Sequence, residues 1–162
     1  MRIRCIRVVF SFFLFFVSSD VLASHAAGMD ISYECISSGA TSDTYKVTLK
    51  FYRDCSGIDA PSYLPLNYSS SCGSGSINLY MVGGAVDINP LCASYCNGGN
   101  AFGIEEYTYE GTVTLAHCSN WVLSVCENAR NGAINTIVQP DWQDLCVQAT
   151  LNNTTYCNNS PT

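Results

Sequence analysis

The chain has few positive charges. Only seven of its 162 residues are lysine or arginine, against 13 aspartates and glutamates, and three of those arginines lie within the first 23 residues. Four cations remain beyond that point: Lys46, Lys50, Arg53 and Arg130. So few cations cannot neutralise a row of phosphates or hold the chain to an anionic lipid surface. We therefore expect no nucleic-acid partner and no membrane-surface partner.

Catalytic signatures are also lacking. The only histidines are His25 and His117, and neither stands in a hydrolase or metalloprotease motif. Glu105, Glu106 and Glu110 offer the carboxylates that a glycosidase pairs. However, Glu106 and Glu110 alternate with tyrosines, as solvent-facing residues of a strand do. The sequence therefore predicts no catalytic residue and no enzyme.

Long apolar runs are missing except at the N-terminus. There Arg2, Arg4 and Arg7 precede an apolar run from Val8 to Val17, and small or branched residues lead to Ala23. This layout predicts a signal peptide over residues 1–23, cleaved after Ala23. An uncleaved anchor is the alternative, but ten residues are too few to span a bilayer. No later segment is predicted to cross a membrane.

Cysteine is abundant. Nine cysteines follow the predicted signal peptide: Cys35, Cys55, Cys72, Cys92, Cys96, Cys118, Cys126, Cys146 and Cys157. In an exported chain this density predicts disulfides, with the connectivity left open. Cys118 and Cys126 bracket one strand and are too far apart to bond to each other if it is extended. An odd number leaves one thiol free, paired with another molecule, or paired with a cysteine beyond Thr162.

Metal binding is an alternative for some of these side chains. Zinc would use Cys92, Cys96, His117 and Cys118, but disulfides are favoured in an oxidising compartment. Calcium would use loop aspartates, for which solvated turn positions are the simpler interpretation. The aspartates concerned are Asp54, Asp59, Asp87, Asp141 and Asp144. We predict no metal and no cofactor.

Apolar residues alternate with a period of two in most segments, which is typical of half-buried strands. The alternating segments lie at 31–35, 45–51, 77–81, 107–115, 121–125 and 145–151, with a shorter β-branched candidate from Ile134 to Val138. Turn residues separate them. This pattern predicts an all-β, disulfide-stapled immunoglobulin-like β-sandwich over residues 24–151, with a barrel as the alternative.

Three segments are predicted to be irregular. Ser56 to Ser76 is rich in proline, serine and glycine, and Asp87 to Gly103 carries two cysteines that tie it down. Cys92 and Cys96 would bond to each other or to the core. Residues 152–162 are interpreted as the start of a linker to a downstream region.

Tyrosines in or beside loops are the candidates for ligand contact. They are Tyr63, Tyr68, Tyr80 and Tyr95. Exposed aromatic side chains on a β scaffold stack on sugars or anchor protein partners, because they bring large area at low entropic cost. The alternative is that these rings are half-buried in the core.

Several short sequence motifs together resemble those of one protein family. They are His25-x-x-Gly28-x-x-Ile31-x-Tyr33-x-Cys35, Tyr52-Arg53-Asp54-Cys55, Cys118-x-x-Trp121-x-Leu123-Ser124, Asn128-Ala129-Arg130-Asn131-Gly132 and Cys157-Asn158-Asn159-Ser160-Pro161. The chain resembles the N-terminal region of large surface proteins of gliding Bacteroidota, which end in a gliding-motility-associated C-terminal domain and often contain PKD repeats.

The resemblance implies a non-enzymatic module of a secreted cell-surface adhesin or gliding-motility protein. It implies export by type IX secretion machinery through a downstream domain, residence outside the cell or on the outer bacterial surface, and a protein or glycan partner. A carbohydrate-binding or accessory domain of a secreted polysaccharide-degrading enzyme is the alternative, and a free-standing secreted enzyme or inhibitor is a second. Within the matched phrases, we hypothesise a bidentate, partly buried ion pair between Arg130 and Asp54 that links two strand ends.

Overall fold

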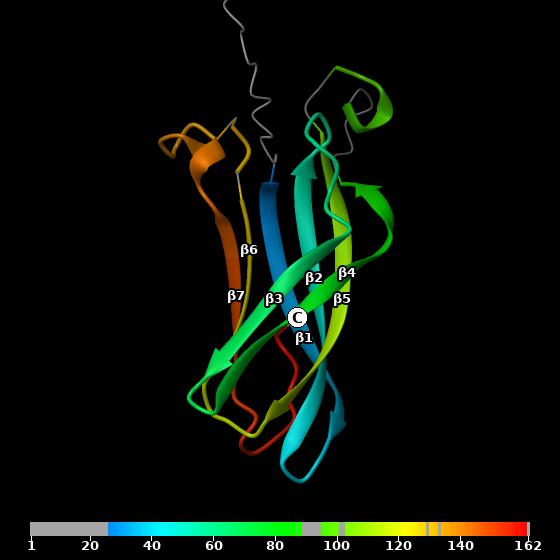
Figure 1. Cartoon of the computed structure of the whole chain (residues 1–162). Coiled ribbons are helices and arrows are strands. Elements are labelled where there is room, and N and C mark those ends of the chain that lie inside the picture. Colours follow the sequence, from blue (N-terminus) through cyan, green and yellow to red (C-terminus); the bar gives the residue numbers. More distant parts are fainter. Residues whose placement is uncertain (1–25, 89–94, 101–102, 129, 133, 162) are drawn as a thin grey trace, which may run out of the picture.

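Seven strands make up most of the domain (Figure 1). A computed structural model describes residues 26–88, 95–100, 103–128, 130–132 and 134–161. The strands are β1 (Ala26–Ser38), β2 (Ser42–Asp54), β3 (Tyr63–Ser70), β4 (Gly73–Asp87), β5 (Ile104–Ala116), β6 (Trp121–Glu127) and β7 (Leu145–Leu151). Two single 3-10 turns accompany them, η1 (Tyr95–Asn97) and η2 (Pro140–Trp142). The predicted all-β class is confirmed. Within the described ranges, no helix has the length and apolar character needed to cross a membrane.

The strands follow the order β1-β2-β5-β4-β3-β6-β7, and every neighbouring pair is antiparallel. In an immunoglobulin-type sandwich the first, second, fifth and fourth strands form one sheet, and the third, sixth and seventh form the other. The chain has this order, so the predicted sandwich topology is confirmed. In addition, β3 pairs with β4, which joins the two layers along one edge.

Alternating side chains from both layers fill the space between the sheets. Tyr45, Leu49, Leu79, Tyr109 and Leu123 are fully buried. All six alternating segments named from the sequence lie in strands and place their apolar residues inward. Burial of these side chains supplies the main apolar contribution to folding.

Two of the predicted local structures are wrong. The stretch from Ser56 to Ser76 contains β3 and the start of β4, because Leu64 and Leu66 alternate inward with Tyr68. Pro65 fits because β6 pairs with β3 only from Asn67 onward, so that β4 alone lies beside the proline. Conversely, residues 134–138 form no strand, and Val138 is exposed.

The C-terminal segment, residues 152–161, is part of the domain rather than a linker. Asn153 is buried, its backbone N–H donates to the Cys118 carbonyl, and its side-chain oxygen accepts from the Cys118 N–H. Further on, the N–H of Ser160 donates to the Tyr33 carbonyl at the free edge of β1. The boundary predicted at Leu151 is therefore moved to include residue 161. The predicted signal peptide lies outside the described residues.

Four disulfides link the described residues: Cys35–Cys157, Cys55–Cys96, Cys72–Cys118 and Cys126–Cys146. Cys96 thus ties its loop to the core, and Cys118 and Cys126 bond to other partners, as the length of the intervening strand requires. Cys92 lies outside the described residues. Four bridges indicate that the domain resides in an oxidising compartment.

Candidate binding face

The outward side of the β1-β2-β5-β4 sheet carries a mixed aromatic and charged surface, which we name the tyrosine face. Residues directly opposite one another on paired strands point to the same side of a sheet. The register places Ser32, Thr48, Glu110, Tyr80 and Tyr63 opposite one another on five successive strands. At a strand spacing of about 4.8 Å, this row is roughly 19 Å long.

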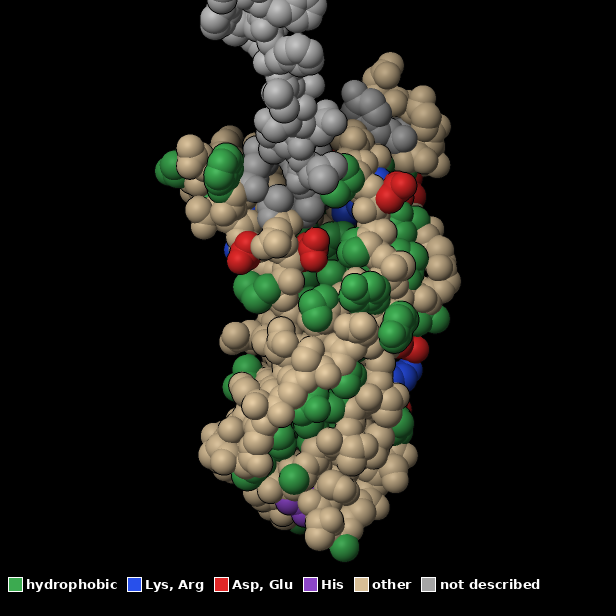
Figure 2. All heavy atoms as spheres, viewed as in Figure 1, with side chains coloured by type: hydrophobic (Ala, Val, Ile, Leu, Met, Phe, Trp, Pro, Cys, Tyr) green, Lys and Arg blue, Asp and Glu red, His purple; other side chains and the backbone are tan. Residues whose placement is uncertain are grey.

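Two exposed tyrosines occupy one end of the row. Tyr63 on β3 and Tyr80 on β4 are 49% and 60% exposed, and their ring centroids lie 6.2 Å apart. Val82 and Val86 continue the exposed apolar surface along β4. Figure 2 shows hydrophobic side chains gathered where β3 and β4 run in Figure 1, with few charged side chains among them. Clustered exposed apolar side chains mark contact sites more often than isolated ones do.

Paired charges occupy the middle of the face. Lys46 Nζ lies 3.3 Å from Glu110 Oε1, and Lys50 Nζ lies 3.1 Å from Glu106 Oε1. Each lysine on β2 therefore has a glutamate on β5 beside it. Between these pairs lie the outward positions of Thr48 and Thr108. The middle of the face thus offers hydroxyl, ammonium and carboxylate groups with little net charge.

A hollow of about 410 Å³ lies at the β1 end of the row. Ser32, Glu34, Lys46 and Thr48 line it from the sheet, and residues 159–161 line it from the C-terminal segment. Asn159 Oδ1 accepts from the Cys35 N–H at 2.8 Å, and Ser160 Oγ accepts from the Tyr33 N–H at 3.1 Å. These bonds and the nearby Cys35–Cys157 bridge fix the segment in place as a wall.

The four tyrosines predicted to contact ligand are placed differently. Tyr63 and Tyr80 lie together and are exposed, although they come from different strands. Tyr68 is half-buried, with its ring centroid 5.9 Å from that of Trp121, as the alternative interpretation expected. The side chain of Tyr95 lies outside the described residues. Tyr52, on the same face, was not singled out; its hydroxyl donates to Asp30 at 3.0 Å. Burial and the neighbouring Asp30 raise the pKa of Tyr52 to about 12.

Arg53 is the buried cation of the domain. Its Nε lies 2.8 Å from Glu105 Oε1, and its guanidinium carbon lies 5.9 Å from the centre of the Tyr107 ring. Arg53 has the same strand parity as the buried residues Leu49 and Phe51, and this parity is the signal that would have identified it. The pair closes one end of the sandwich, with 7% of the Arg53 side chain and 14% of the Glu105 side chain exposed.

The hypothesised ion pair between Arg130 and Asp54 is wrong. Arg130 Nε donates to the carbonyl oxygen of Asp144 at 3.0 Å. Asp54 accepts from the backbone and hydroxyl of Ser56 and from Asn131 Nδ2 at 3.2 Å. Asp54 directly follows a strand, so it closes a local turn with Ser56, and the amide of Asn131 makes the link to the neighbouring segment.

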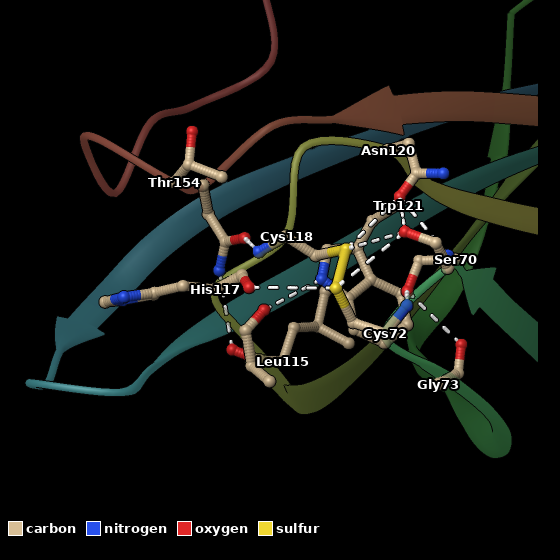
Figure 3. Close-up of a disulfide and its surroundings, with 12 residues drawn as sticks. Ser70, Cys72, Gly73, Leu115, His117, Cys118, Asn120, Trp121 and Thr154 are labelled. Atoms are coloured by element: carbon tan, nitrogen blue, oxygen red, sulfur yellow. Dashed lines mark hydrogen bonds between the residues drawn. A yellow bond between two sulfur atoms is a disulfide. The ribbon is translucent and has the colours of Figure 1, made fainter.

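A polar network lies at the opposite end, around the buried carboxylate of Asp43. Ser38 Oγ donates to it at 2.8 Å, Asn153 Nδ2 at 3.3 Å, and His117 Nε2 lies 3.4 Å away. Burial alone would raise the pKa of Asp43, but the hydrogen bonds from Ser38, His117 and Asn153 and the charge of His117 lower it below its usual value. Figure 3 shows the neighbouring Cys72–Cys118 bridge, with the His117 ring pointing away from the sulfur atoms.

The polar groups of these networks bond to one another. Ser38 contacts Asp43 and not His117, so the histidine does not activate the hydroxyl. Glu105, Glu106 and Glu110 each lie beside a cation. Cys96 and Cys118 are in disulfides, which removes them from the zinc ligand set considered above. No cluster of three or more metal-ligating side chains occurs among the described residues.

The comparisons with known proteins add no relative: no family model, no curated protein and no solved structure matches the chain. The resemblance to gliding-bacteria surface proteins therefore stays a prediction.

Proposed function

We propose that the domain is a non-enzymatic binding module of a secreted adhesin or gliding-motility-associated surface protein, and that it contacts its partner through the tyrosine face. The observation that carries this proposal is the exposed pair of Tyr63 and Tyr80 beside a row of polar groups. Aromatic anchors surrounded by polar side chains are typical of protein recognition surfaces. The disulfides fix the sheet that presents them, so little conformational entropy is lost on binding.

We also propose the location that such a role requires. The signal peptide takes the chain across the inner membrane, and type IX secretion machinery, acting on a downstream domain, takes it to the outer surface. Four disulfides support an oxidising destination. Reading the coding frame beyond Thr162 tests this proposal. A sorting domain after further β domains supports it, and an immediate stop codon contradicts it.

A carbohydrate-binding accessory domain of a polysaccharide-degrading enzyme is the second candidate. The observation that favours it is the combination of two tyrosine rings with Thr48, Thr108 and Glu110 on one side of the sheet. Aromatic rings stack on the apolar faces of sugars, while hydroxyl and carboxylate groups bond to sugar hydroxyls. In this case the downstream frame encodes a catalytic domain instead of repeated β domains.

Binding assays with matched variants test the tyrosine face itself. The chain without its signal peptide is coated on beads, and bead adhesion is measured on arrays of polysaccharides and of bacterial surface proteins. We expect Tyr63→Ala with Tyr80→Ala to weaken adhesion at least about tenfold, because aromatic anchors carry much of such interfaces.

Ser124→Ala with Gln148→Ala, on the opposite side of the sandwich, is the control and should leave adhesion unchanged. Equal adhesion by the tyrosine variant and the parent rules out this face as the contact surface. The array to which the parent binds decides between the two candidates.

A further inference from the structure

The C-terminal segment displays an exposed tyrosine on an anchored loop. Tyr156 is 76% exposed. Before it, the side chain and backbone of the buried Asn153 bond to the backbone of Cys118. After it, Cys157 is joined to Cys35 by a disulfide. The chain on both sides of the ring is therefore held by the core, so a ligand that contacts the ring orders little additional backbone.

Two hollows share Thr155 and Tyr156 as lining residues. One hollow, of about 300 Å³, is completed by Asn152 and Asn158. The other, of about 410 Å³, extends to the turn between β1 and β2 and to the end of β5. Its remaining lining residues are Ser38, Gly39, Asp43, His117, Asn153 and Cys157. The Tyr156 ring thus forms a wall common to both hollows, and each volume falls within the roughly 300–1,000 Å³ typical of small-ligand sites.

The lining of the two hollows is polar and exposes little charge. Its groups are mainly side-chain amides and hydroxyls, and of the described residues that line it none is lysine, arginine or glutamate. The carboxylate of Asp43 is buried and accepts from Ser38 and Asn153, and His117 lies beside it. A phosphate or carboxylate would find no lysine or arginine partner here. The lining fits a neutral ligand that is rich in hydroxyl groups.

We propose that this end of the domain binds a neutral linear polysaccharide, with Tyr156 stacked on one sugar ring and neighbouring sugar units in the two hollows. An aromatic ring packs against the apolar face of a sugar, and amide and hydroxyl groups bond to its hydroxyls. A protein partner fits less well, because specific protein interfaces bury about 800 Å² per partner around an apolar core. Of the described lining residues, Tyr156 alone has a large apolar side chain. The site is separate from the tyrosine face and does not depend on the function proposed for that face.

Calorimetric titration of the chain without its signal peptide tests this inference. The probes are cellohexaose, laminarihexaose, xylohexaose and mannohexaose, each with its monosaccharide. We expect at least one hexasaccharide to bind, at least about tenfold more tightly than its monosaccharide, because linked sugar units occupy both hollows. Hexagalacturonic acid, an acidic oligosaccharide of the same length, should bind at least about tenfold more weakly, because its carboxylates stay unpaired.

Matched variants assign the binding to the ring. Tyr156→Ala is expected to weaken binding of that hexasaccharide at least about tenfold, as loss of an aromatic anchor does. Tyr156→Phe keeps the stacking surface and should stay within about twofold of the parent. Trp142→Ala is the control: Trp142 is 79% exposed but precedes β7, whereas Tyr156 follows it, so the two rings lie at opposite ends of that strand. Its binding should equal that of the parent. Because the Tyr156 ring is exposed, Tyr156→Ala should also keep the Tm of the parent.

Three results overturn the proposal: no binding of any neutral hexasaccharide, parent-like binding by Tyr156→Ala, or equally tight binding of hexagalacturonic acid. Tyr63→Ala with Tyr80→Ala should leave this binding unchanged. If that variant loses the hexasaccharide while Tyr156→Ala retains it, the sugar site is on the tyrosine face and the present proposal is wrong. The two proposals therefore fail separately.

Discussion

The two outer faces of the sandwich have the same backbone architecture and different chemistry. The tyrosine face carries exposed aromatic rings and two Lys–Glu pairs. On the outward side of β6, β7 and the part of β3 from Asn67 onward the side chains are uncharged, and we name this side the hydroxyl face. It consists of Asn67, Ser69, Val122, Ser124, Cys126, Cys146, Gln148 and Thr150. Both inner faces obey the same apolar alternation, so folding constrains the two sheets alike.

The difference shows which outward positions carry side chains that folding and solubility do not require. A solvent-facing strand position tolerates most polar residues, and serine, threonine and glutamine on the hydroxyl face satisfy that requirement. Exposed Tyr63 and Tyr80 are not needed to solubilise a sheet. Their clustering beside paired charges is the reason for proposing a partner contact at this face, and the hydroxyl face provides the control surface.

Disulfide removal gives the largest expected effect and compares the two faces directly. Cys35–Cys157 borders the tyrosine face and closes 122 positions, whereas Cys126–Cys146 lies on the hydroxyl face and closes 20. By chain entropy we expect paired Ser substitutions to cost about 5 kcal/mol at the first bridge and about 3 kcal/mol at the second. Urea unfolding of both variants measures the difference in free energy. The reverse order would show that native contacts, and not loop length, decide what each bridge contributes.

Arg53→Ala is expected to have the next largest effect. The substitution removes the guanidinium partner of the half-buried Glu105 carboxylate, which still accepts from the Tyr107 hydroxyl. We expect a cost of about 3 kcal/mol, the lower end for a buried pair. Arg130→Ala is the matched comparison and should cost about 1 kcal/mol, because it loses one hydrogen bond to a carbonyl. Chemical denaturation distinguishes them. If both variants lose the same free energy of unfolding, the buried ion pair of Arg53 contributes no more to stability than the single hydrogen bond of Arg130.

The half-buried carboxyl of Glu127, at the end of β6, makes the stability of the domain depend on pH. Burial, and then the charge of Asp144, raise the pKa of the Glu127 carboxyl above its ordinary value of 4.5. The folded state therefore binds this proton more tightly than the unfolded state, and stability falls as pH rises from the unfolded pKa through the folded one. We expect Glu127→Gln to raise the Tm at pH 7 and to have little effect below about pH 4. A variant that is less stable than the parent at pH 7 would show that the carboxylate makes a favourable contact there.

The strand pattern was predictable because period-two alternation is a local property of the sequence. Burial of Tyr45, Tyr109 and Leu123 follows from it directly. β3 was missed because a proline and several serines mask an alternation of only three apolar residues. The pairing of Tyr63 with Tyr80 was not predictable, since it depends on the register of a hairpin that was not recognised. The disulfide map likewise depends on which loops the two sheets bring together.

The Arg130 hypothesis failed for a related reason. Arg130 and Asp54 both lie near the ends of predicted strands, which suggested the pair. The alternation along β2, however, places Arg53 on the buried side. The boundary at Leu151 failed because residues 152–161 have no apolar alternation. They are held by a disulfide and by side-chain bonds to the edge of β1. Sequence periodicity cannot reveal contacts of this kind.

The smallest expected effect is the one that most sharpens the comparison of the two faces. Lys46 and Glu110 are 39% and 34% exposed in their side chains and 3.3 Å apart. Exposed pairs of this kind contribute little, so Lys46→Gln with Glu110→Gln should change the free energy of unfolding by less than about 0.5 kcal/mol. Urea unfolding at low and at physiological salt measures this, with the charge-swapped pair Lys46→Glu and Glu110→Lys as the control. A loss above about 1.5 kcal/mol would make the paired charges part of the fold, and their restriction to one face would then say nothing about function. If stability is unchanged while bead adhesion changes, the charges serve the partner, and the contrast with the uncharged hydroxyl face has a functional cause.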